Sequence, residues 1–177
     1  MDLGAVAHLS SIKGHIPFLH FFDGFRTSHE IQKVDCLDYE DLAQLVDWDE
    51  LKKFRQNALN PEHLVLRTTG QYSDTYFQSR EACNLYYDQL PDIVAGYMEE
   101  IGRLTGRDYK PFNYYGADDA EYVIVGMGSM AGCAWETVDY LLKKGEKVGY
   151  LDVHLYRPFS AKYFLSQLPE TVRKITI

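Results

Sequence analysis

The sequence contains only three cysteines, and no two of them form a CxxC pair. An odd number of isolated thiols (Cys36, Cys83 and Cys133) argues against a disulfide scaffold and against a metal or iron–sulfur site built from this chain alone. Basic residues are also fewer than acidic ones, 18 against 26, so the formal net charge is −8. The chain therefore lacks the excess of Lys and Arg that nucleic-acid binding requires.

Long apolar runs are absent as well. No stretch reaches the length that spans a bilayer, and the first residues lack the basic flank and apolar core of a signal peptide. We therefore expect no membrane partner and a cytoplasmic location, or a hydrogenosome or another organelle in a eukaryote. What the chain does contain is 46% hydrophobic residues, among them 14 tyrosines. This composition excludes disorder and predicts a folded chain with a core.

The N-terminal region predicts one helix and one buried strand. Apolar residues at helical spacing predict a helix over 3–13, which Gly14 ends in the left-handed conformation open to glycine. The almost wholly apolar run 16–22 predicts a strand buried on both faces, as in a parallel sheet.

Two aspartates mark the next elements. Asp38 and Asp47 stand at positions typical of helix N-caps and predict short helices over 39–46 and 48–58. Residues 62–88 show no clear period, so we expect a long loop with a short helical or extended piece.

The clearest helical pattern covers 91–105. Pro91 suits the first turn of a helix, and Gly106 suits its end. The polar stretch that follows carries proline, glycine and tyrosines, so we expect a linker there. The predicted division is 1–108, the linker 109–120, and 121–177.

Strands and helices alternate after this linker in a βαβαβ order. The predicted strands are 122–125, 147–153 and the run from 172, and the predicted helices are 131–143 and the one capped by Ser160. Alternation of this kind implies a parallel sheet with right-handed crossovers.

The motif GMGSMAG at 126–132 follows a predicted strand and opens a predicted helix, which is the context of a phosphate-binding turn. Its candidate cofactor-binding residues are Gly126, Gly128 and Ser129. However, the spacing is GxGxxxG instead of GxGxxG, and Asp152 lies within the next strand instead of at its exit. The alternative is that the glycines only permit a tight turn and close packing.

The segment FFDGFRTSHE at 21–30 holds the densest group of polar side chains. Its candidates for substrate binding or for a domain interface are Asp23, Arg26, Thr27 and His29. They follow a predicted buried strand, where α/β proteins place ligand sites. Arg26 has the planar fork that clamps an anion, whereas the alternative is a turn held by local hydrogen bonds and an ion pair.

Several stretches closely resemble pyruvate:ferredoxin (flavodoxin) oxidoreductases, and together they cover nearly the whole chain. They are IPFLHFFDGFRTSHEIQKV at 16–34, NPEHLVLRTTGQ at 60–71, YFQSREACNLYY at 76–87, EYVIVGMGSM at 121–130 and HLYRPF at 154–159.

The resemblance implies an α/β chain that combines the end of a pyrimidine-type thiamine diphosphate domain with the start of a unit similar to the transketolase C-terminal domain. Members of this family decarboxylate pyruvate oxidatively with coenzyme A and pass electrons to ferredoxin or flavodoxin. They use thiamine diphosphate, Mg²⁺ and [4Fe-4S] clusters. The implied partners are the remaining domains of a longer enzyme, its substrates and electron acceptor, and a second subunit in a homodimer.

The resemblance assigns no catalytic residue to this chain, because the cofactor-activating Glu and the pyruvate-binding residues of the family lie in other segments. We therefore expect the isolated chain to be inactive and to hold no cofactor by itself. For Arg26 we expect an ion pair that locks one domain against its neighbour. Two other readings stay open: a non-catalytic interaction or scaffold module, and a free nucleotide-binding α/β domain.

Overall fold

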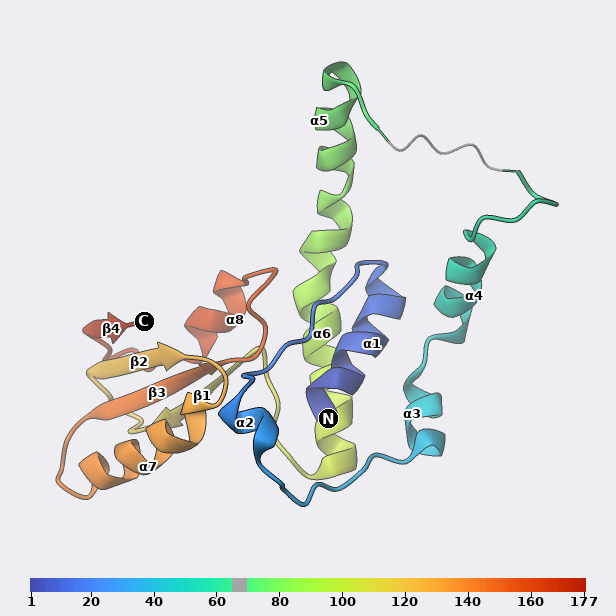
Figure 1. Ribbon diagram of the computed structural model, residues 1–177. Coiled ribbons are helices and arrows are strands. Elements are labelled where there is room, and N and C mark those ends of the chain that lie inside the picture. The colour runs from blue at the N-terminus through green and yellow to red at the C-terminus, as the bar shows by residue number, and fades with distance from the viewer. Residues whose placement is uncertain (65–69) are drawn as a thin grey trace.

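The computed structural model describes residues 1–64 and 70–177, which form a helical unit (1–106) and a sheet unit (112–177) joined by a connector (107–111) (Figure 1). The helices are α1 (Asp2–Gly14), α2 (Arg26–His29), α3 (Tyr39–Leu45), α4 (Trp48–Gln56), α5 (Ser73–Ala82), α6 (Asn84–Thr105), α7 (Met130–Leu142) and α8 (Ala161–Ser166). The strands are β1 (Phe112–Gly116), β2 (Tyr122–Gly126), β3 (Val148–Val153) and β4 (Lys174–Thr176).

The sheet has the order β1-β3-β2-β4. Strand β2 lies parallel to both β3 and β4, which confirms the parallel βαβαβ pattern predicted from the sequence. Strand β1 is antiparallel to β3, so the sheet is mixed. The chain is therefore a mixed α/β structure.

The stretch expected to form the linker, 109–120, contains strand β1. The register runs from Phe112 opposite Val153 to Gly116 opposite Gly149, and the Phe112 side chain is fully buried. Pairing with a distant strand and burial of one aromatic ring therefore override the turn-forming composition of this stretch.

Helices α7 and α8 cover opposite faces of the sheet (Figure 1). Successive residues of β3 point to opposite faces, as in any strand. Tyr150 packs with Val138 of α7, whereas Leu151 belongs to the cluster against which Phe164 of α8 packs. The short β3 strand thus contributes to two cores at once.

The core of the helical unit lies between α1 and α6. Its buried members are Val6, Leu9, Leu90, Val94, Tyr97, Met98, Ile101 and Leu155. The last of these follows β3, so the sheet unit supplies one side chain to the helical core.

Helix α1 confirms the first predicted helix but not the reason given for its end. Gly14 is the last helical residue, and His15 takes the left-handed cap conformation with φ = 54°. A Cβ at Gly14 would lie 2.5 Å from Leu90 Cδ1. Glycine at position 14 therefore leaves room for the Leu90 side chain of α6, and the left-handed cap is formed by His15.

Helix α6 begins at Asn84, earlier than predicted, and Pro91 lies inside it. The expectation that Pro91 opens the helix is thus wrong. The preceding turn contains Leu90, which is 1% exposed and packs in the helical core. Burial of this side chain stabilises helical turns before the proline, at the cost of one backbone hydrogen bond.

The predicted buried strand over 16–22 is also wrong, because the segment forms no strand and is largely exposed. Ile16 and Phe18 pack against the helical core, whereas Leu19 and Phe22 are 85% and 73% exposed. Within the described ranges, all four strands of the sheet come from the sheet unit. The segment thus has no neighbouring strand to satisfy its backbone groups.

Helices α3 and α4 confirm the two predicted caps. Asp38 accepts a hydrogen bond from the Glu40 N–H at 2.8 Å, and Asp47 accepts one from the Glu50 N–H at 3.1 Å. The predicted loop over 62–88 is in part helical, since α5 and the start of α6 lie in it. The remainder of that prediction includes residues 65–69, which lie outside the described residues.

Candidate functional site

The glycine-rich turn predicted from the sequence joins the carboxyl end of β2 to the amino end of α7. Gly128 has φ = +81°, in the left-handed region that favours glycine. Backbone N–H groups in the first turn of a helix have no partner within the helix and attract anions. An anionic group can therefore be held at this turn.

The anion found at the turn is a carboxylate of the chain itself. Asp23 Oδ2 accepts a hydrogen bond from the Ser129 N–H at 2.6 Å. A Cβ at Gly128 would lie 2.9 Å from Asp23 Oδ2, so the carboxylate uses space that a side chain would fill. Hydrogen bonding to Ser129 lowers the pKa of Asp23. Two groups predicted separately from the sequence thus meet through Asp23 and Ser129.

The other candidates of segment 21–30 do not join this contact. Arg26, Thr27 and His29 lie in the single turn of α2, and all three are exposed. His29 Nδ1 bonds the carbonyl oxygen of Phe25, and the Thr27 carbonyl accepts a hydrogen bond from the Glu30 N–H at the end of α2. These bonds are local, as the alternative reading of a hydrogen-bonded turn describes.

Arg26 makes no ion pair within residues 1–64 and 70–177. The domain lock expected for its guanidinium is therefore not found in the described part of the chain. The contact between the two units at this place is made by Asp23 instead.

Gly126 has a packing role. It ends β2, and a Cβ at this position would lie 2.7 Å from Met130 Sδ and 3.1 Å from the Tyr150 hydroxyl. Absence of a side chain thus allows α7 to approach the strand, which agrees with the packing reading of the motif.

Asp152 lies beside this turn, at the carboxyl end of β3 and opposite Gly126 in the register. Its side chain is buried, with Oδ2 3.2 Å from His154 Nε2 and Oδ1 3.4 Å from the Tyr150 hydroxyl. Burial, together with the charge of Asp152, raises the pKa of Tyr150 to about 12. Both oxygens of the Asp152 carboxylate therefore have partners within the protein.

The turn does not fit a diphosphate or a dinucleotide. The Asp23 carboxylate takes the Ser129 N–H, and a second anion placed there would meet this negative charge at short range. Asp152, the acidic residue of the next strand, is paired with His154. Both observations weigh against the reading as a free nucleotide-binding domain.

Two further aspartates, Asp2 and Asp92, contact distant parts of the chain, and sequence patterns gave no sign of these contacts. Asp2 at the start of α1 is buried and accepts hydrogen bonds from Tyr109 and Arg107 of the connector. Although burial alone raises the pKa of Asp2, these two hydrogen bonds outweigh it and lower the pKa. The partners lie more than one hundred residues apart, beyond the reach of any local spacing rule.

The second of these aspartates, Asp92, links α6 to α8. Asp92 Oδ1 accepts hydrogen bonds from Lys162 Nζ at 2.9 Å and from the Tyr163 hydroxyl at 2.6 Å. Both bonds lower the pKa of Asp92. Asp92 and Tyr163 line an open groove of about 860 Å³ between α6, the connector and α8.

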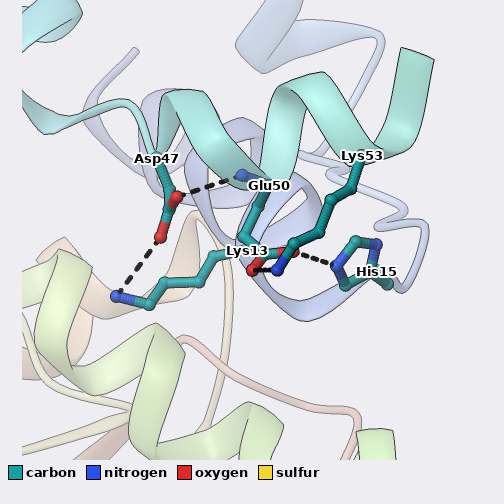
Figure 2. Close-up of polar contacts among 5 residues, drawn as sticks. All are labelled: Lys13, His15, Asp47, Glu50 and Lys53. Carbon is teal, nitrogen blue, oxygen red and sulfur yellow. Dashed lines mark hydrogen bonds and ion pairs between the residues drawn. The ribbon is translucent and has the colours of Figure 1, made fainter. Parts of the chain in front are cut away.

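A separate polar cluster fixes α4 against the end of α1 (Figure 2). Glu50 accepts hydrogen bonds from Lys53 Nζ and His15 Nε2, each at 2.6 Å, and these lower the pKa of Glu50. Asp47 caps α4 and lies 4.0 Å from Lys13 Nζ. Asp47 and Glu50 are half-buried, whereas their basic partners Lys13, His15 and Lys53 are exposed. Each carboxylate has a basic partner, so the cluster serves to position α4 against α1.

Asp47→Ala is expected to destabilise the chain by about 1 kcal/mol, because the first turn of α4 loses its cap. The loss should appear as a lower midpoint in urea unfolding followed by circular dichroism. Asp88→Ala, on the exposed side of α6, serves as the control, since Asp88 has no partner in the described parts of the chain. Equal midpoints for the two variants would contradict the assigned role of Asp47.

Residues 1–99 match the family model described as pyruvate flavodoxin/ferredoxin oxidoreductase, thiamine diphosphate-binding. Residues 120–177 match the model of pyruvate:ferredoxin oxidoreductase core domain II. The fold and the first match together define the class: a mixed α/β chain whose N-terminal part matches a thiamine diphosphate-binding family. The chain belongs to the pyruvate flavodoxin/ferredoxin oxidoreductase family, as the resemblance predicted.

Curated relatives agree with this assignment. The chain is 60% identical over 177 residues to the pyruvate-flavodoxin oxidoreductase of Enterobacter agglomerans and 59% identical to the pyruvate:ferredoxin oxidoreductase of Moorella thermoacetica. It is 48% identical over 178 residues to the pyruvate dehydrogenase [NADP(+)] of Cryptosporidium parvum. All of this chain is aligned in each case, but it spans only 15%, 15% and 9% of the relatives' lengths.

Residues 1–64 and 70–177 contain no cluster of three or more His, Cys, Asp or Glu side chains placed to hold a metal ion. Cys36 and Cys133 are exposed free thiols, and Cys83 is a half-buried one. None of the helices in these two ranges combines the length and the apolar character needed to cross a bilayer.

Proposed function

We propose that this chain is the part of a pyruvate:ferredoxin or pyruvate:flavodoxin oxidoreductase that joins the thiamine diphosphate-binding region to core domain II. The whole enzyme decarboxylates pyruvate with coenzyme A to acetyl-CoA and CO₂ and delivers electrons to ferredoxin or flavodoxin. The observation that carries the role of this chain is the hydrogen bond from Ser129 to Asp23. It connects a residue of the first matched region to the glycine-rich turn of the second.

The proposed division of the chain is a first domain over 1–108, a junction over 109–120 and a second domain over 121–177. Support comes from the two family matches, which leave residues 100–119 between them. We assign the first part to the pyrimidine-type thiamine diphosphate domain and the second to a unit similar to the transketolase C-terminal domain. The parallel β2–α7–β3 unit supports the second assignment.

In this proposal the chain positions its neighbours and supplies no catalytic residue. Thiamine diphosphate with Mg²⁺ supplies the carbanion chemistry of the enzyme when bound, and [4Fe-4S] clusters carry the electrons. The glycine-rich turn of this chain does not fit the diphosphate, because Asp23 is bonded to it. We therefore assign the diphosphate to parts of the enzyme outside this chain, and the clusters to its other domains.

The proposed partners are those remaining domains, ferredoxin or flavodoxin, pyruvate, coenzyme A and a second subunit of a homodimer. Exposed aromatic side chains on the segment after α1 and on α5 support contacts with further domains, because apolar surface of this kind is usually covered. The proposed location is the cytoplasm.

Asp23→Ala tests the positioning role in the enzyme that carries this chain. Loss of the carboxylate leaves the Ser129 N–H without its partner, so we expect a lower thermal midpoint at unchanged Michaelis constants for pyruvate and coenzyme A. Asp88→Ala, an exposed carboxylate without a partner among the described residues, is the matched control. An unchanged midpoint for Asp23→Ala would remove the basis of the positioning role.

Arg26→Lys separates this role from anion binding. Because Arg26 has no ion pair in the described ranges, we expect both the thermal midpoint and the Michaelis constants to stay unchanged. A Michaelis constant raised about tenfold for either substrate, corresponding to about 1.4 kcal/mol, would instead identify Arg26 as an anion-binding residue.

A further inference from the structure

His154 lies between two groups that can only accept hydrogen bonds. Its Nε2 is 3.2 Å from Asp152 Oδ2, and its Nδ1 is 2.9 Å from the carbonyl oxygen of Lys110. A carboxylate and a carbonyl have no hydrogen to donate, so both ring nitrogens must carry one. Only the imidazolium form satisfies both contacts. The exposed fractions of the His154 and Asp152 side chains are 17% and 7%, so water replaces neither partner easily.

This imidazole sits where the two units meet. Asp152 belongs to β3, whereas Lys110 belongs to the connector. Two backbone hydrogen bonds also join the connector to the end of β3: the N–H groups of His154 and Leu155 both donate to the Pro111 carbonyl, each at 3.0 Å. Leu155 then enters the core of the helical unit. A change at His154 is therefore transmitted directly to the junction of the units.

We propose that His154 is a proton-dependent clip, which in its protonated form holds the connector against the carboxyl end of β3 and on losing its proton loosens the junction between the helical and sheet units. This inference concerns regulation of the positioning role proposed above. The neutral ring keeps only one hydrogen, and the charge of Asp152 favours keeping it on Nε2. Nδ1 then faces the Lys110 carbonyl with a lone pair, so the hydrogen bond that holds the connector is replaced by a repulsion.

The charged groups around His154 favour the protonated form. Asp152 is the carboxylate in contact, and its second oxygen accepts from the Tyr150 hydroxyl. From the connector, the Tyr109 ring faces the imidazole edge-on at 6.1 Å, and the Lys110 ammonium turns away to Asp108 at 3.0 Å.

Beyond this ring, Asp2 of α1 is neutralised by Arg107. Within the described parts of the chain the charge in contact with His154 is thus a single negative one. Burial alone lowers the pKa of His154, but the hydrogen bond and charge of Asp152 outweigh it and raise the pKa above the ordinary 6.5.

This direction fixes the pH range of the effect. A raised folded-state pKa means that the stabilisation is complete below about pH 6.5 and disappears as the pH rises through the folded value. The clip is thus closed in mildly acidic conditions and opens on the alkaline side.

Amide hydrogen exchange, followed by mass spectrometry on peptides covering 107–116 and 150–156, tests the proposal in the protein that carries this chain. We expect protection of both peptides, corrected for intrinsic exchange, to fall at least about threefold between about pH 6 and about pH 8.5. In His154→Gln protection should be lower at the acidic end and independent of pH. Asp152→Asn should move the transition to lower pH, because it removes the charge that stabilises the imidazolium.

His8→Gln is the matched control, since His8 is exposed on α1 and far from the connector in the chain. It should keep the pH dependence of the unmodified protein. Protection that does not change with pH in the unmodified protein overturns the proposal. So does a pH dependence that survives in His154→Gln, which would place the titrating group elsewhere. If Asp23→Ala leaves the thermal midpoint unchanged while the exchange result holds, only the positioning role through Asp23 fails.

Discussion

Ile101→Ala is expected to lower the free energy of unfolding by about 2–5 kcal/mol, because it leaves a cavity between α1 and α6. The Ile101 side chain is 0% exposed and belongs to the cluster that contains Val6, Leu9 and Leu155. That cluster holds the helical unit together and also receives a side chain from the sheet unit. Urea unfolding followed by circular dichroism measures the loss as a lower midpoint at unchanged slope.

Ile31→Ala is the matched control, since Ile31 is 101% exposed. It removes the same atoms from a side chain that contributes no burial, so the midpoint should change little. Similar midpoints for the two variants would show that the packing of α1 against α6 does not limit the stability of the chain.

Gly116→Ala is expected to cost about 3 kcal/mol or more, through backbone strain added to steric overlap. Gly116 ends β1 with φ = +149°, which side chains rarely allow. A Cβ at this position would lie 2.5 Å from Gly149 Cα and 2.6 Å from the Val148 carbonyl oxygen. Both are backbone atoms of the paired strand, so relief requires separation of β1 from β3.

Gly132→Ala, a second glycine-to-alanine substitution, is expected to stabilise the chain instead. Gly132 lies in α7, is exposed, and has no atom within 4 Å of the position that a Cβ would take. The variant should gain about 0.5–1 kcal/mol, because alanine favours the helix more than glycine does. Thermal unfolding of both variants measures these changes as shifts of the midpoint. A loss of stability in Gly132→Ala would contradict the open surface at this glycine, and no loss in Gly116→Ala would contradict the close approach of β1 to β3.

Elements with a local signal could be predicted from the sequence. Asp38 and Asp47 define α3 and α4 because a capping carboxylate bonds an amide two or three residues away. The alternation of apolar strands with amphipathic helices predicted β2, α7 and β3 in their parallel order. The glycine-rich turn was found in the same way, since its glycines stand between a strand and a helix.

Features that depend on distant partners could not be predicted. Strand β1 is polar and aromatic, and it is a strand because β3 pairs with it. The run 16–22 has strand composition but no pairing partner in the described ranges. In the candidate site, Asp23 and Ser129 were each identified, but their contact spans 106 positions of the chain. Composition indicates what a side chain can bond, whereas the fold decides which partner it reaches.

The pairing of α1 with α6 also has a consequence for biosynthesis. Helix α1 ends at Gly14, and its partner begins at Asn84, so about 70 residues are made between the two. At a synthesis rate of about 5–20 residues per second, several seconds pass between the synthesis of α1 and that of the helix that covers its apolar side. During this interval Val6 and Leu9 lack the α6 side chains that pack against them in the folded chain. Closing so long a loop also makes this contact late and slow compared with formation of the β2–α7–β3 unit.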